Sequence, residues 1–271
     1  MEEHVSWITH FVNQYLGGAA LALLHALHIQ SSHPDLPIPE SVVMAMVVFV
    51  IGALATLWLK PRLSVDNPGG AQQIAELLIT NPIGFGIRDL LIENAHDKKG
   101  KYFAMVGSVS VFILLANILS VFPALSAPTA VLTVPLGCAV VTFLYFNWQG
   151  MRHHGVGGYL KHFAGPVWWL APLMFPVEII STCARVLSLT VRLWANIFAS
   201  DLLYVIFLGL LVGPATWGWE KSPALGILLG IFPALIPLAF IGLHIFVAII
   251  QTYVFTLLPS IYIGIATADE H

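Results

Sequence analysis

The sequence has few charged residues, only two cysteines and, in its first 59 residues, neither lysine nor arginine. Charged side chains make up 9% of the 271 residues and hydrophobic ones 58%, whereas about 25% of an average soluble domain is charged. So few polar side chains cannot cover a globular surface, which excludes a soluble enzyme, a nucleic-acid-binding protein and a disordered tail. Both cysteines lie in apolar stretches, which excludes a disulfide framework and a CxxC metal site. The composition predicts an all-α membrane protein, with residues 1–271 forming a single membrane domain.

Five apolar stretches are predicted to form membrane helices: residues 42–59, 103–122, 127–146, 167–211 and 223–265. The first three suit a hydrocarbon core about 30 Å thick, which needs roughly 20 helical residues. The last two are so long that each would form about 65 Å of helix. Each could contain two short spans, but neither contains a polar turn of convincing length. We therefore favour two long, steeply tilted helices, joined as a hairpin by the polar residues 213–222.

Two further segments are less apolar. In residues 69–94, isoleucines and leucines recur at helical spacing among charged residues, which predicts an amphipathic interfacial helix broken by Pro82. Residues 8–29 could span the membrane or lie on its surface, and their polar interruptions favour the surface. The Pro-rich residues 31–40 are typical of a linker.

The basic residues predict the orientation. Eight of the eleven fall on one side of the five-span arrangement, namely Lys60, Arg62, Arg88, Lys98, Lys99, Lys101, Arg152 and Lys161. Only Lys221 falls on the other side, and the remaining two lie within a span. The positive-inside rule places the eight in the cytoplasm. The N-terminal segment 1–38 is then extracytoplasmic and the C-terminus cytoplasmic.

Candidate functional residues are the ionisable groups within the spans, because each costs about 2.5–3.5 kcal/mol at the bilayer centre. They are Glu178, Arg185, Arg192, Asp201 and His244. At 100° per residue, the first three share one helix face with Asn196, whereas Asp201 points to the opposite face. In the last stretch, His244, Gln251 and Tyr262 share a face. Each of these groups could simply hold helices together through hydrogen bonds.

Arg192 is the strongest candidate, because arginine cannot lose its proton and is a fixed charge in the membrane. Glu178 lies 14 residues away, which is about 21 Å along a helix, and Asp201 faces elsewhere. An anion supplied by another subunit is therefore expected. Arg185 could pair with Glu178 on the same face or extend towards the cytoplasmic surface.

Residues 187–201, LSLTVRLWANIFASD, resemble the signature of subunit a of the F-type ATP synthase. The spacing of His244 and Gln251 and the block 123–136 resemble the same family, and the similarity extends from about His4 to the end of the chain. The resemblance implies a proton-translocating stator subunit with two offset half-channels beside a rotating ring of c-subunits. It also implies peripheral-stalk b subunits, an indirect link to the catalytic head, no catalysis by the subunit itself, and a bacterial plasma (inner) membrane.

The resemblance also implies roles for individual residues. Arg192 would be the essential arginine that faces the carboxylates of the ring. The extracytoplasmic half-channel would contain Asn196, Asp201, His244 and Gln251. The cytoplasmic half-channel would contain Glu178, Ser181, Arg185 and Tyr262.

Two other classes of function fit the sequence less well. A secondary ion transporter would usually have internal repeats, and we find none. A membrane-embedded hydrolase would need a metal site or a nucleophile motif. The clustered His153, His154 and His162 have no nearby carboxylate or cysteine, and neither GxSxG nor HExxH occurs. We predict no metal, no cofactor and no nucleic-acid partner, and the sequence leaves open whether the ion is H⁺ or Na⁺.

Overall fold

The computed structural model describes residues 6–26, 28, 36–81, 84–121, 127–164 and 168–268. These residues form helices and connections without a strand, which confirms the all-α fold. The α-helices are α1 (Trp7–Ala26), α2 (Glu40–Leu59), α3 (Gly70–Ile79), α4 (Ile87–Ala95), α5 (Phe103–Leu119), α6 (Thr133–Ala164), α7 (Ala171–Lys221) and α8 (Pro223–Thr267). Short 3₁₀ helices cover Lys60–Arg62, Pro128–Ala130 and Trp168–Leu170.

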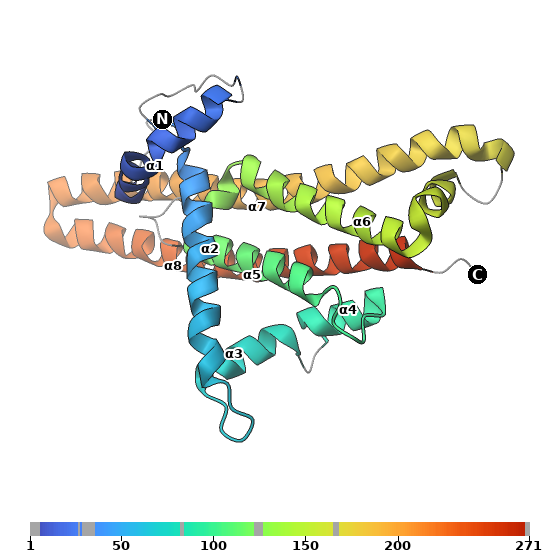
Figure 1. Ribbon diagram of the computed structural model, residues 1–271. Helices are drawn as coiled ribbons and strands as arrows, with labels where there is room; N and C mark the ends of the chain where they lie inside the picture. The colour runs from blue at the N-terminus through green and yellow to red at the C-terminus, as the bar shows by residue number, and fades with distance from the viewer. Residues whose placement is uncertain are drawn as a thin grey trace.

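The two longest helices, α7 and α8, lie side by side and run in opposite directions, with α5 and α6 packed along them (Figure 1). The expected polar connector 213–222 is helical as far as Lys221, so the chain turns at Ser222. The Ser222 Oγ accepts a hydrogen bond from the Leu225 amide at 3.3 Å and caps α8. The turn can be this short because Gly226 lies against Trp219, where an added Cβ would be 2.6 Å from the indole ring.

By length and composition, three described helical segments could cross a membrane: Glu40–Arg62, Ala171–Lys221 and Ala239–Thr267. Helix α5 is apolar but shorter, with 17 residues. Helix α6 begins at Thr133 rather than at residue 127, because a 3₁₀ turn precedes it, and it continues to Ala164 across a kink at Gly155, whose φ is 72°. The five-span arrangement stays a prediction.

The segment 69–94 forms two helices, α3 and α4, rather than one. Pro82, which we expected to break it, lies outside the described residues, as do residues 31–35 of the linker and residues 122–126 of the expected turn. Helix α4 packs against α8, where Gly264 lies so close to the Asn94 carbonyl that a larger residue would not fit.

The core consists of two clusters of buried side chains along α8. One joins α4, α5, α6 and α8, and the other joins α5, α6, α7 and α8. Large apolar side chains on the outside remain exposed, as at Phe49 and Leu54 of α2 and Ile180 and Leu187 of α7. Such a surface requires an apolar environment, which a bilayer or a membrane partner supplies.

Candidate functional site

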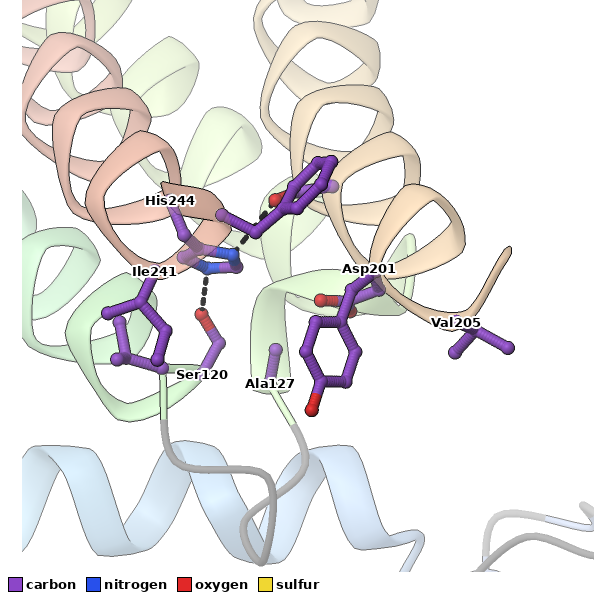
Figure 2. A pocket seen from close by; sticks show the side chains of 10 residues that line it. Ser120, Ala127, Asp201, Val205, Ile241 and His244 are labelled. Carbon is purple, nitrogen blue, oxygen red and sulfur yellow. Dashed lines mark hydrogen bonds between the residues drawn. The ribbon is translucent and has the colours of Figure 1, made fainter. Parts of the chain in front are cut away.

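A pocket with both polar and apolar side chains on its wall lies between α7, α8 and the C-terminal end of α5 (Figure 2). Its volume is about 310 Å³. It is lined by Ser120, Val121, Ala127, Ser200, Asp201, Tyr204, Val205, Phe240, Ile241 and His244. The pocket therefore gathers two of the predicted residues, Asp201 from α7 and His244 from α8, with three hydroxyl groups.

Two serines from different helices fix the His244 ring. Its Nε2 lies 2.5 Å from the Ser120 Oγ and its Nδ1 lies 2.9 Å from the Ser200 Oγ. A hydroxyl donates or accepts as required, so this pair can serve either tautomer of the imidazole. Both serines were missed in the sequence. Ser200 precedes the predicted Asp201, whereas nothing local connects Ser120 with a histidine 124 residues later.

Asp201 projects from α7 into the same pocket, with its carboxylate turned towards His244 (Figure 2). Both side chains line the pocket, and among the described residues no direct hydrogen bond joins them. A space of this size, with an acid, an imidazole and hydroxyl groups on its wall, can hold water molecules that link these groups.

A cluster of polar side chains lies nearer the N-terminal end of α7. The Arg185 Nη2 lies 3.4 Å from the Glu178 Oε1, so these residues form an ion pair, which was one of the two arrangements expected for Arg185. The Arg185 guanidinium also lies 5.3 Å from the ring centroid of Tyr262 in α8, a cation–π contact. Ser181 lies on α7 between the two charged residues and is half-buried.

Arg192 lies on α7 between Arg185 and Asp201 and is exposed. Its Nη2 lies 3.5 Å from the Ser188 Oγ, one turn earlier on α7. Within the described part of the chain, no carboxylate lies within ion-pair distance of its guanidinium. Asn196, one turn further along α7, is also exposed.

Gln251 of α8 contacts the backbone of Arg192 in α7. Its side chain, 1% exposed, donates a hydrogen bond from Nε2 to the backbone carbonyl oxygen of Arg192 at 2.9 Å. A buried amide of α8 thus holds the segment of α7 that carries the exposed guanidinium. Neither hydropathy nor helix period predicts this contact with the backbone.

Helix geometry gives the spacing along α7. Glu178 lies about 21 Å before Arg192 and Asp201 about 14 Å after it, at about 1.5 Å per residue. A fixed cation therefore lies between the Glu178–Arg185 ion pair on one side and the pocket of Asp201 and His244 on the other.

A family described as "ATP synthase A chain" matches residues 41–264. The chain belongs to this family. The chain is 39% identical over 272 residues to ATP synthase subunit a of Koribacter versatilis, covering 99% of each chain. It is 38% identical over 264 residues to the subunit of Solibacter usitatus, covering 96% of this chain and 99% of the relative. It is 32% identical over 249 residues to the subunit of Trichlorobacter lovleyi, covering 92% of this chain and 94% of the relative.

Membership of the ATP synthase A chain family confirms the resemblance carried by residues 187–201. The chain is accordingly a non-catalytic, proton-translocating membrane subunit of an F-type ATP synthase.

Proposed function

We propose that Arg192 is the fixed charge that separates two proton half-channels in the membrane stator of the synthase, where it faces carboxylates on a rotating ring of c-subunits. The observation that carries this proposal is that Arg192 is exposed and that no acid among the described residues lies beside it. An intramembrane cation needs an anion, and a partner subunit supplies it.

The pocket of Asp201 and His244 forms the extracytoplasmic half-channel. Its acid, imidazole and hydroxyl groups can pass protons through water from the extracytoplasmic side towards Arg192. Asn196, exposed between Asp201 and Arg192, provides the next polar step on the surface of α7. Gln251 acts differently from its neighbours, because it positions Arg192 through the backbone.

The cluster of Glu178, Ser181, Arg185 and Tyr262 forms the cytoplasmic half-channel. Its place before Arg192 along α7 agrees with the orientation from the basic residues, in which α7 runs from the cytoplasm outwards. Glu178 is bound to Arg185 but is still 38% exposed, so it can take up a proton released from the ring.

Arg192 couples the two half-channels in two ways. Its positive charge repels protons and prevents a direct leak between them. It also stabilises the ionised form of a passing carboxylate, so that the carboxylate releases its proton before it moves on. Protons then cross only on the ring, and each releases about 2.3 kcal/mol per 100 mV of membrane potential.

The long hairpin fits a steeply tilted arrangement against such a ring. Helices of 51 and 45 residues would be about 77 and 68 Å long, against a hydrocarbon core of about 30 Å. In Figure 1 both run across the direction of α2. If α2 crosses the bilayer, α7 and α8 lie at a steep tilt and present a long face to a neighbour. The remaining partners are the peripheral-stalk b subunits and, indirectly, the catalytic head, in a bacterial plasma membrane with the N-terminus outside.

The test is Arg192→Ala in the complete complex, with Val191→Ala as a control that removes exposed apolar surface next to it. We expect Arg192→Ala to abolish proton-driven ATP synthesis and ATP-driven proton pumping, because the barrier between the half-channels is lost. Val191→Ala should retain both activities. Normal pumping by assembled Arg192→Ala complexes would refute the role of Arg192.

A further inference from the structure

One face of helix α1 contacts the residues just before α2. Asn13 forms two hydrogen bonds with the Ile38 backbone, accepting from its amide at 2.9 Å and donating to its carbonyl at 3.1 Å. One turn on either side, Thr9 is buried and Gly17 lies against Pro37, where an added Cβ would be 3.3 Å from the proline ring. The spacing of four residues makes this the docking face of α1.

This attachment fixes the depth of α1 relative to α2. Ile38 lies two residues before the first residue of α2, Glu40. If α1 crossed the membrane towards the outside, Asn13 would lie about 20 Å below the outer end of the helix at Ala26. Ile38 and the carboxyl group of Glu40 would then lie at that depth, and α2 would have only about 10 Å of a core about 30 Å thick left to cross. Since α2 needs the whole core, Asn13 has to lie at the outer surface.

The opposite side of α1 carries an exposed aromatic row. Trp7, Phe11 and Tyr15, also spaced by four residues, are 76%, 56% and 71% exposed. The rings of Phe11 and Tyr15 are in contact, with centroids 4.9 Å apart. Helix α1 has no Asp, Glu, Lys or Arg. Aromatic side chains without charges suit the boundary between headgroups and acyl chains, where Trp and Tyr are enriched. Figure 1 shows α1 at the N-terminal end of α2, oblique to it.

We propose that α1 lies in the plane of the extracytoplasmic leaflet, held at the start of α2 by Asn13, with Trp7, Phe11 and Tyr15 inserted at the headgroup boundary. The inference rests on the proposed crossing of the membrane by α2 with the N-terminal end of α2 on the extracytoplasmic side. The occupant of the aromatic row is the lipid surface itself. Because α1 has no Lys or Arg, its insertion does not depend on anionic lipid.

The test measures the depth of three positions in the complete complex, reconstituted in phosphatidylcholine vesicles whose acyl chains are brominated either near the headgroup or near the chain end. The fluorescence emission of Trp7 is obtained by subtracting the emission of the Trp7→Phe complex from that of the native complex. The double variants Trp7→Phe/Phe11→Trp and Trp7→Phe/Tyr15→Trp report the other two positions in the same way. We expect equal depths and stronger quenching by the shallow bromines at all three positions.

A spanning helix would give a different result, because the depth would change by about 12 Å between positions 7 and 15. Such a gradient would overturn the proposal. Absence of quenching by both lipids would also overturn it, since the aromatic row would then face water or protein. ATP-driven proton pumping by the same vesicles tests the proposed function separately. Normal pumping with a depth gradient would refute only the placement of α1.

Discussion

The hydrogen bond between Gln251 and the Arg192 carbonyl gives the sharpest test of how the protein positions its fixed charge. Gln251→Met removes the donor and keeps a side chain of similar size. It leaves no buried polar atom unpaired at position 251, and the Arg192 carbonyl still takes part in the hydrogen bonding of α7. The substitution therefore removes the contact between α8 and the backbone of Arg192 with little effect on packing.

The expected magnitude follows from hydrogen bonds within membranes, which average about 0.6 kcal/mol and reach about 1.7 kcal/mol. Because 1.4 kcal/mol corresponds to a tenfold change in an equilibrium constant, the equilibrium constant for the arrangement in which α8 holds Arg192 should fall by a factor between about 3 and about 16. We expect the number of protons pumped per ATP hydrolysed to fall by no more than this factor, without the complete loss expected for Arg192→Ala.

The assay is ATP-driven acidification of inverted membrane vesicles, compared with ATP hydrolysis by the same vesicles. Thr252→Val is the matched control. Its hydroxyl is also buried in α8 but donates to the Ala248 carbonyl of its own helix at 2.8 Å. The control should lose a similar hydrogen bond without releasing Arg192. Native coupling in Gln251→Met, or an equal loss in Thr252→Val, would contradict the reasoning.

Three further substitutions test other parts of the site and the packing. Glu178→Gln should reduce passive proton conduction through the membrane sector stripped of the catalytic head, because it removes the exit acid; unchanged conduction would leave Glu178 only an ion-pair partner. Asp201→Asn should slow ATP-driven pumping several-fold while the subunit still co-purifies with the complex, and an unchanged rate would remove Asp201 from the proton path. Gly264→Ala should destabilise the contact between α4 and α8 by about 1–3 kcal/mol through overpacking, lowering the temperature at which the complex loses its membrane sector. Gly242→Ala lies in the same helix, where an added Cβ meets nothing within 4 Å, and it should leave this temperature unchanged. Equal temperatures for the two variants would show that the close approach at Gly264 is unimportant.

Local patterns in the sequence determine most of the helices and the family. The scarcity of charge and the apolar stretches predict a helical membrane protein because backbone groups in lipid must be paired within a helix. The spacing of Glu178, Arg185 and Arg192 on one face follows from the helix period alone, and the motif around Arg192 indicates the family. The boundaries are less well determined. Residues 213–221 have the composition of a loop but extend α7, because packing against α8 outweighs the local preference of Gly213 and Pro214.

The tertiary structure decided which residues meet. His244 contacts serines 44 and 124 residues away, and Gln251 reaches a backbone carbonyl 59 residues away. Hydropathy and periodicity describe each helix separately, whereas these contacts depend on how α5, α7 and α8 are shifted and rotated against one another. Backbone carbonyls have no sequence signal at all, so the attachment of Arg192 by Gln251 and of Ile38 by Asn13 could be found only in three dimensions. The sequence thus determined the charges and their spacing along each helix, and helix packing determined which groups hold them in place.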